Sequence, residues 1–332
     1  MNPGFWAIDP DTDELVWILY SELDEDERRQ LFKPIGGFCF EANKFLYMKL
    51  AKAPFYVQDW LPKRGKCMIY APAKSGKSFL SMQMARCIAS GEEFLGLRTT
   101  QGRVLYIQFE MGEEILQDRL TLTKKDYENV YVGTSFSLKL DTEPGKNQLN
   151  VAMEAVQPNV LILDPLYKAI IGDENSGQEM RSVLDYLDEL IEGYDCSILL
   201  IHHTGKDLTK RGRGTSIFED WVDSYIAMKR LSKDNEPLKV MIKTVLMRHA
   251  ISGDSLEAVL VNFEFEPGEK TMTVKKRVFE FIKNAKKLPI SPDLIFKADI
   301  GSNNSVYKAL KALIEEGVIE KVGYGQYQLK KA

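Results

Sequence analysis

The stretch Ala71–Ser78 constrains the fold of this chain more than any other feature. It reads Ala-Pro-Ala-Lys-Ser-Gly-Lys-Ser, follows an apolar run over Cys67–Tyr70 and opens a helical pattern over Lys77–Ser90 that stops at Gly91. A buried strand, a loop ending in Gly-Lys-Ser and a helix are the context that a phosphate-binding loop requires, because backbone N–H groups and the helix N-terminus attract phosphate oxygens. The stretch therefore predicts a site for the phosphates of ATP.

Each position of this loop has an expected role. Gly76 lets the backbone wrap around a phosphate, Lys77 reaches the β- and γ-phosphate oxygens, and the Ser78 hydroxyl binds Mg²⁺. Ala71 stands where the motif has glycine, and alanine is acceptable there if its φ is negative. The residues expected to line the bound nucleotide are Ala71, Pro72, Ala73, Lys74, Ser75, Gly76, Lys77, Ser78 and Phe79.

Short apolar runs alternate with amphipathic helical patterns from Gly65 to a strand over Ser197–Ile201. Apolar strands that alternate with helices indicate a parallel sheet covered on both faces. The pattern then changes to consecutive strands over Ser224–Lys229, Val240–Val245 and Leu256–Phe263, which predicts an antiparallel extension of the sheet. The predicted fold class is therefore α/β, with a P-loop NTPase core whose strands are mostly parallel.

Two acidic residues end predicted strands of this sheet. Asp164 follows Val160–Leu163, and a carboxylate at the end of a buried strand is costly unless it is paired or near a metal ion, so we assign it to the Mg²⁺ site. Pro165 follows, so the base that activates water has to come from another strand. Glu110, after Val104–Phe109, is the candidate for that base. The alternative is an acid favoured by the dipole of the next helix.

Two histidines, His202 and His203, end the predicted strand that begins at Ser197. Because side chains alternate along a strand, only one of them can point into the site. One interpretation is a polar group that contacts the bound nucleotide. The other is a strand end with purely structural hydrogen bonds.

The 332 residues are enough for one large α/β domain and a small second one. We predict an N-terminal segment over residues 1–54, the core over 55–265 and a small domain over 266–332, with the turn-rich stretch Glu266–Lys270 as the boundary. The four cysteines form no CxxC pair, and no apolar run is long enough to cross a bilayer. These features predict a cytoplasmic protein without a membrane partner.

The carboxyl-terminal part differs from the rest in charge and in pattern. Lys275–Ala332 holds 12 Lys and Arg against 6 Asp and Glu, whereas the whole chain has a net charge of −4. Helical patterns over Lys275–Asn284, Pro292–Ala298 and Asn303–Glu316 precede a hairpin pattern, which is the order of a winged helix-turn-helix domain. Lys308 and Lys311 on the third helix are the predicted contacts with duplex DNA. The alternative is a module that binds a protein.

Taken together, the motifs resemble the RepA-like branch of the RecA-type P-loop ATPases, with their RepA/RecA/KaiC-like core. The similar stretches are APAKSGKS (71–78), VLYIQFEMGEE (104–114), VLILDPL (160–166), IHHTGK (201–206) and RGRGTS (211–216), and the resemblance covers about residues 55–265. The best-known members of that branch are hexameric replicative DNA helicases. The resemblance therefore implies a hexameric, Mg²⁺-dependent ATPase that acts on DNA. The winged-helix tail is a departure, because the minimal plasmid helicases lack it.

The resemblance also implies roles for single residues. Lys77 and Ser78 would bind phosphate and Mg²⁺, Glu110 would be the catalytic carboxylate, and Asp164 the Walker B acid. His203, less surely His202, would sense the γ-phosphate. Arg230 would enter the active site of a neighbouring subunit, where a cation stabilises the charge that develops on the transferred phosphoryl group. An exposed strand-end cation is the alternative for Arg230.

The loop Thr204–Thr215 carries Lys206, Lys210, Arg211 and Arg213 among glycines. In a ring, such a loop would touch the phosphates of single-stranded DNA in the channel. The alternative is a solvated surface loop.

Three functions remain to be separated. The first is a ring ATPase that moves on or remodels DNA, and the second is a regulator or initiator whose oligomeric state is switched by ATP. The third is a DNA-binding protein with a decayed nucleotide site, against which the presence of both Glu110 and Asp164 argues.

Overall fold

The computed structural model describes residues 4–8, 15–19, 22–24, 33–36, 38–48, 55–174, 176–203, 215–249, 255–271, 274–285, 288–298, 300–323 and 325–330. The chain divides into two compact units, Met1–Ala53 and Pro54–Ala332. The start of the second unit lies within a residue of the predicted start of the core. This unit contains both the core and the carboxyl-terminal elements, so the boundary predicted after residue 265 does not separate compact units.

The first unit contains an antiparallel hairpin and a short helix. Strand β1 (Gly4–Ile8) pairs with β2 (Leu15–Leu19), and helix α2 covers Ala42–Tyr47. The second unit opens with a small antiparallel pair, β3 (Phe55–Val57) and β4 (Leu61–Pro62).

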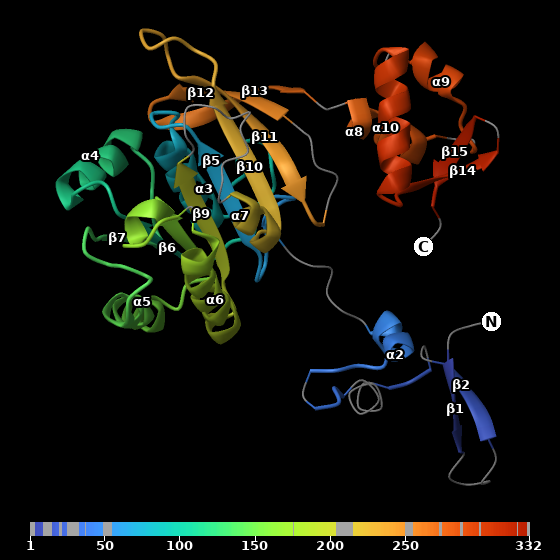
Figure 1. Ribbon diagram of the computed structural model, residues 1–332, viewed down its shortest axis with the longest axis horizontal. Helices are drawn as coiled ribbons and strands as arrows, with labels where there is room; N and C mark the ends of the chain where they lie inside the picture. Colours follow the sequence, from blue (N-terminus) through green and yellow to red (C-terminus); the bar gives the residue numbers. More distant parts are fainter. Residues whose placement is uncertain are drawn as a thin grey trace. The chain divides into compact units, whose positions relative to one another are not determined.

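A nine-stranded sheet with the order β13-β12-β11-β10-β5-β9-β8-β6-β7 forms the core of the second unit (Figure 1). Neighbours from β10 to β7 are parallel, and β10 to β13 are antiparallel. The strands are β5 (Lys66–Ala71), β6 (Val104–Gln108), β7 (Val130–Thr134), β8 (Val160–Asp164), β9 (Ser197–His203), β10 (Ser224–Arg230), β11 (Lys239–Met247), β12 (Ser255–Val261) and β13 (Glu264–Thr271). The predicted α/β core with an antiparallel extension is confirmed.

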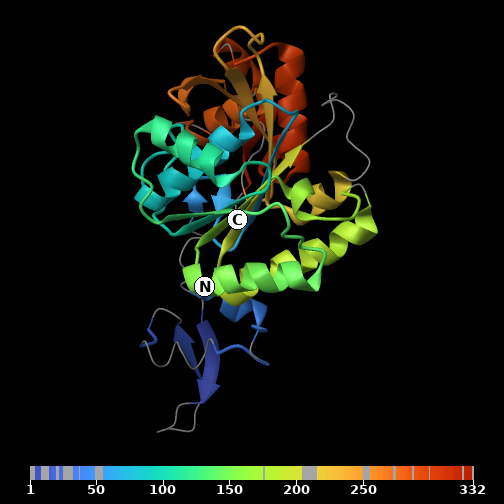
Figure 2. The same ribbon diagram turned by 90° about the vertical axis from the view of Figure 1, so that its left-hand side faces the viewer.

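Apolar side chains fill both faces of this sheet. Ile69 and Ile162 belong to one hydrophobic cluster, together with residues of α3, whereas Met68 and Leu161 belong to a second cluster with residues of α6. Helices α3 and α6 therefore cover opposite faces, as the two views indicate (Figures 1 and 2). The helices of the core are α3 (Lys77–Ser90), α4 (Glu113–Thr123), α5 (Glu143–Val156), the 3₁₀ helix η1 (Leu166–Ala169), α6 (Gly177–Tyr194) and α7 (Thr215–Trp221).

The predicted turn-rich boundary Glu266–Lys270 is wrong, because these residues form part of strand β13. β13 is an edge strand of the sheet and pairs with β12, and Ala258 lies opposite Pro267 beside a shift in register. A proline has no N–H to donate, and an edge strand tolerates it because only one side of the strand needs partners. The core therefore extends to Thr271, and the first carboxyl-terminal helix begins at Val274.

The carboxyl-terminal elements have a hydrophobic core of their own, which includes Val278, Ile295, Leu310 and Tyr327. Three helices precede a hairpin, and a bridge joins Ile290 to Tyr327. The elements are α8 (Val274–Lys283), α9 (Pro292–Lys297), α10 (Asn303–Glu315), β14 (Ile319–Gly323) and β15 (Gln326–Leu329). Their order and type agree with the sequence pattern.

None of the helices in the described part of the chain is long and apolar enough to cross a membrane.

Candidate nucleotide-binding site

The predicted site residues meet at the carboxyl ends of neighbouring strands. β5, β9, β8 and β6 are consecutive in the sheet. Ala71, the last residue of β5, is paired with His203 at the end of β9, and Gln108 at the end of β6 is paired with Asp164 at the end of β8. The carboxyl edge of a parallel sheet is where such folds place their ligands.

The loop after β5 has the backbone that a phosphate-binding loop needs. Lys74 and Gly76 have φ values of 61° and 85°, whereas Ala71 continues the strand. A Cβ on Gly76 would lie 2.7 Å from Leu238 Cδ2 and 2.9 Å from Phe265 Cζ. Glycine is therefore required at position 76 for two reasons, and alanine at position 71 causes no strain.

Lys77 is buried, with 4% of its surface exposed. Its Nζ donates to the carbonyl oxygens of Ala71 and Pro72, both at 2.9 Å, and lies 3.5 Å from His203 Nδ1. Burial lowers the pKa of the Lys77 ammonium to about 8, while the charges of Asp164 and Glu110 act in the opposite direction. The ammonium is thus oriented by weak backbone acceptors, which a phosphate oxygen with full charge can replace.

Asp164 is held by hydroxyl groups at the bottom of the site. The carboxylate is 1% exposed, and its Oδ2 accepts from Tyr106 OH and, at 3.4 Å, from Ser81 Oγ. Burial raises the pKa of Asp164, and hydrogen bonds from Tyr106 and Ser78 oppose that rise. A carboxylate beside the Ser78 hydroxyl provides the hard oxygen donors that Mg²⁺ prefers, so these two residues fit the ion.

Tyr106 is a site residue that the sequence analysis missed. It contacts Asp164 across a separation of 58 residues in the chain. The available signal was the alternation in β6, where Tyr106 and Gln108 share one side of a strand that is otherwise aliphatic.

Glu110 lies between two other groups of the site. Its Oε1 accepts a hydrogen bond from Tyr167 OH, and its Oε2 is 4.0 Å from His203 Nε2. Helix α4 has Gly112 as its N-cap and its own first-turn acids, so Glu110 precedes the helix rather than belonging to its first turn. The surroundings of Glu110 thus favour a role in the site over a role in the helix.

The two histidines point to different sides, as the alternation predicted. His203 lies beside Lys77, and its ring makes an edge contact with the Tyr167 ring at 5.2 Å. His202 is 5% exposed and packs 3.6 Å from Glu174 Oε2 and against Phe218. Burial lowers the pKa of His202 to about 4, with smaller contributions from His203 and Lys77. At neutral pH the His202 ring is therefore uncharged, and its contact with Glu174 is not an ion pair.

A pocket opens next to Ser78 on the side of α4. It is lined largely by apolar groups, among them Phe79, Leu120 and Phe263, and Arg119 is one of its charged members. The rings of Phe79 and Phe263 are 5.8 Å apart, and the Arg119 guanidinium lies over the Phe79 ring at 4.9 Å. Flat groups thus surround a small apolar space beside the phosphate loop. Of these residues, only Phe79 was predicted.

Arg230 ends β10, as predicted, and is held by the turn that follows. Nη1 lies 2.9 Å from Asp234 Oδ1, Nη2 donates to Lys233 O at 2.8 Å, and Nε donates to Ser232 O at 3.1 Å. These partners are exposed or partly exposed and belong to the β10–β11 connection. The guanidinium of Arg230 is therefore bound by the hairpin that joins β10 to β11.

The predicted contacts with nucleic acid divide into two groups. Lys206, Lys210, Arg211 and Arg213 lie outside the described residues. Lys308 and Lys311 are exposed on α10, and Lys311 Nζ is 3.8 Å from Glu315 Oε1. The opposite side of α10 is buried through Val306, Leu310 and Leu313.

Comparisons with known proteins gave one family match and a similar solved structure. Residues 44–208 match the model of a protein family described as an AAA domain. A solved structure of a KaiC-like protein from the hyperthermophilic archaeon Pyrococcus horikoshii OT3 is 14% identical, covers 66% of this chain and 98% of its own, and gives a TM-score of 0.49. The family match spans the phosphate loop, Glu110, Asp164 and His203. Together with the geometry of the site, it supports a P-loop ATPase.

Proposed function

We propose that this chain hydrolyses ATP in a homo-oligomeric ring, hexameric as in the RepA-like helicases that its motifs resemble, and acts on DNA as a helicase or translocase in replication or recombination. The observation that carries the proposal is the convergence of Lys77, Asp164, Glu110 and His203 at one edge of the sheet. A phosphate cradle, a carboxylate for the metal and a carboxylate for water are the parts that phosphoryl transfer to water requires.

Binding of the triphosphate begins with Lys77. The phosphate oxygens replace the carbonyl oxygens of Ala71 and Pro72 as acceptors of its N–H groups, and the backbone N–H groups from Lys74 to Ser78 face the β-phosphate. Ser78 and Asp164 would hold Mg²⁺, which would supply positive charge beside the phosphates. The base of ATP enters the pocket of Phe79, Arg119 and Phe263, which lies next to Ser78.

Glu110 acts on the attacking water. Its Oε1 is fixed by Tyr167, and its Oε2 faces His203, which in turn contacts Lys77. A water molecule bound to Glu110 Oε2 would give up a proton to the carboxylate as it attacks the γ-phosphorus, while the bond from that phosphorus to the β–γ bridging oxygen breaks and ADP leaves with this oxygen. His203 lies between the base and the phosphate-binding lysine, which is a suitable place for a group that responds to the loss of the γ-phosphate.

Arg230 completes the site of a neighbouring subunit in this proposal. Its present partners are a mostly exposed carboxylate and two carbonyl oxygens of its own turn, and exposed ion pairs of this kind are weak. The γ-phosphate of an adjacent subunit is a stronger partner, because it carries more charge in a less polar setting.

A second function is favoured by the carboxyl-terminal module. Its three helices and hairpin, with Lys308 and Lys311 exposed on α10, suit a winged helix that binds duplex DNA. The chain would then be an initiator or regulator whose oligomeric state follows the bound nucleotide. In that case ATP changes the size of the assembly, and DNA does not accelerate hydrolysis.

The test is ATP hydrolysis by the full chain with and without single-stranded DNA, combined with sizing in the presence of a nonhydrolysable ATP analogue. A helicase or translocase assembles into a ring and hydrolyses ATP faster on single-stranded DNA. An assembly that responds to the analogue but not to single-stranded DNA supports the regulator. Absence of both hydrolysis and nucleotide binding would refute the proposed function.

A further inference from the structure

One face of the phosphate-loop helix is attached to the β12–β13 turn by three successive contacts. Phe79, Gln83 and Arg86 lie on this face of α3, at helical spacings of four and three residues. They meet Phe263, Phe265 and Glu264, three consecutive residues of the turn and of β13. Residues that are far apart in the chain are thus matched one to one.

Gln83 binds the backbone of β13 as another strand would. Its Nε2 donates to Phe265 O at 2.9 Å, and its Oε1 accepts from Phe265 N at 2.8 Å. β13 is an edge strand, so within the described part of the chain these two backbone groups have no strand to pair with on that side. The buried side-chain amide replaces the missing peptide group, which a buried backbone requires.

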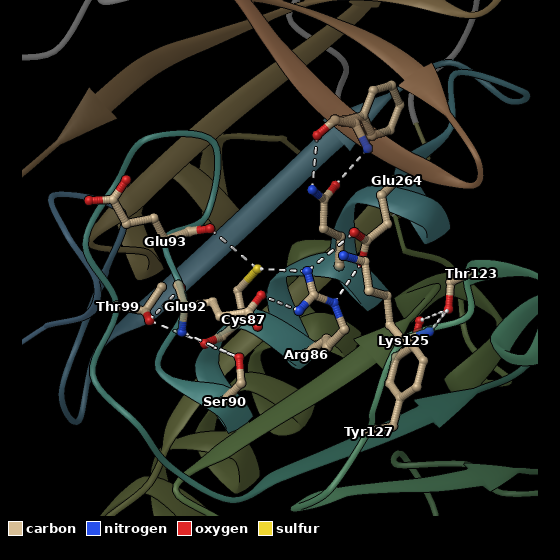
Figure 3. A network of polar contacts seen from close by, with 12 residues as sticks. Arg86, Cys87, Ser90, Glu92, Glu93, Thr99, Thr123, Lys125, Tyr127 and Glu264 are labelled. Atoms are coloured by element: carbon tan, nitrogen blue, oxygen red, sulfur yellow. Dashed lines mark hydrogen bonds and ion pairs between the residues drawn. The ribbon is translucent and has the colours of Figure 1, made fainter.

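Arg86 binds Glu264, the neighbour of Phe265 in the chain, through an ion pair. Its Nε and Nη2 donate to the two carboxylate oxygens of Glu264 at 2.6 and 3.2 Å, and its Nη1 contacts Glu92 at 2.5 Å (Figure 3). Arg86 is 5% exposed and the Glu264 side chain 15%. A bidentate pair with this degree of burial defines both distance and orientation.

Phe263 occupies a position in which a bulky residue is unfavourable. Asn262 and Phe263 form the two-residue connection of the hairpin, with φ values of 49° and 66°. Turns of this kind favour Asn-Gly, and a phenylalanine with positive φ is a strained outlier that persists only where its surroundings hold it. The ring of Phe263 lies 5.8 Å from that of Phe79 and lines the pocket beside Ser78.

We propose that Gln83 and Arg86 are positioning residues of the nucleotide site, which hold Phe263 in its strained conformation so that its ring forms a wall for the base of ATP. The inference rests on the proposed function, since it assumes that the pocket receives the base. Through these two side chains, the helix that binds the phosphates also sets the position of the base wall. Arg86 lies outside the lining of the pocket and acts through Glu264, whereas Gln83 also contributes to that lining.

The test compares the affinity of the full chain for ATP with its affinity for inorganic tripolyphosphate, which has the phosphates but no base. Phe263→Gly removes the ring and the strain together, so we expect ATP to bind about 10-fold more weakly, with unchanged tripolyphosphate binding and no loss of thermal stability. Gln83→Met and the pair Arg86→Met with Glu264→Met should show the same selective loss. The paired change avoids an unpaired buried charge, which would destabilise the fold.

A double-mutant cycle separates positioning from general damage. When Phe263→Gly is combined with Gln83→Met or with the Arg86→Met and Glu264→Met pair, the loss in ATP affinity should be no larger than for Phe263→Gly alone, because the ring has already been removed. Arg64→Met, which breaks the exposed pair with Asp195, is the matched control and should bind both ligands like the parent.

Three results would overturn the inference. The Gln83→Met and Arg86→Met/Glu264→Met variants could bind ATP like the parent, they could lose as much affinity for tripolyphosphate as for ATP, or their losses in ATP affinity could add to that of Phe263→Gly in the cycle. A parent chain that binds neither ligand would instead refute the proposed function, and the inference with it.

Discussion

The core and the carboxyl-terminal module place their charged groups in opposite ways. In the core, Lys77, Asp164 and Arg86 are at most 5% exposed, and each is bound by named partners. In the module, Lys308 and Lys311 are exposed to solvent. A buried charge acts on one partner at short range, whereas exposed charges act together through a field that salt weakens. Changes in the core should therefore be large and specific, and changes in the module small and sensitive to salt.

The largest expected effect comes from Glu110→Gln. The amide cannot accept the proton of the attacking water, so turnover should fall by about 10³-fold while ATP affinity stays near that of the parent. Single-turnover hydrolysis and ATP titration measure the two quantities separately. Lys77→Ala is the contrasting variant, because it should lose tight ATP binding itself. Parental turnover in Glu110→Gln would show that another group is the base.

Arg230→Ala should have the next largest effect if the site is shared between subunits. Nucleotide binding should be retained, and turnover should fall by about 10²-fold, as for the loss of one donor to a charged transition state. Mixing these subunits with Lys77→Ala subunits should restore part of the activity at interfaces that join an intact Lys77 to an intact Arg230. If subunit exchange is demonstrated and activity does not return, the site is complete within one chain.

A third test concerns His202, the buried group that does not face the site. Its folded pKa, lowered mainly by burial to about 4, lies below the unfolded value of 6.5, so only the unfolded state takes up a proton between these values. Stability should therefore fall as the pH drops from about 6.5 to about 4, by up to about 3 kcal/mol. His202→Gln should remove this part of the pH dependence.

Glu174 acts with the opposite sign, since burial raises its pKa, so the informative quantity is the difference between variant and parent. Urea unfolding at a series of pH values measures it, and His249→Gln, at an exposed position, is the control. Equal slopes for His202→Gln and the parent would mean that His202 takes up a proton as readily in the folded state as in the unfolded state.

The smallest effect is expected in the module. Lys308→Glu together with Lys311→Glu should weaken duplex DNA binding about 10-fold at low salt and reduce the dependence of affinity on salt, with basal ATP hydrolysis unchanged. Lys124→Glu with Lys125→Glu makes the same change in net charge on the core and is the control. If the parent binds no duplex DNA at low salt, α10 is better regarded as a surface for a protein partner.

Local patterns predicted much of the fold. Helix α3 begins and ends where the sequence indicated, because Gly76 and Gly91 both adopt positive φ at its ends. The helical pattern over Asn150–Val156 predicts only the second half of helix α5, which begins at Glu143, since the proline in its first turn resembles a break and is in fact compatible with a helix start. Pro267 was misleading in the same way, because it lies on an edge strand.

The contacts of the site were less accessible to prediction than its main residues. Lys77, Glu110, Asp164 and His203 could be identified because each ends a strand or begins a helix. Their partners Tyr106 and Tyr167 are joined to them only by the order of strands in the sheet, which a single sequence does not contain. Gln83 and Arg86 appeared to be ordinary polar positions of an amphipathic helix, since their partners lie about 180 residues further along the chain.

The two edges of the sheet have different consequences for handling the protein. At one edge, the Gln83 side chain forms hydrogen bonds with the backbone of β13. At the other edge, β7 has no strand on its outer side among the described residues, and its Tyr131 and Val132 are each 44% exposed. Bare edge strands with apolar side chains are templates for intermolecular β-pairing and hence for aggregation, and a charged residue is the usual protection against it. We therefore expect that aggregation of the concentrated protein begins with pairing between β7 strands of different molecules. Val132→Lys is the smallest change that would prevent this aggregation.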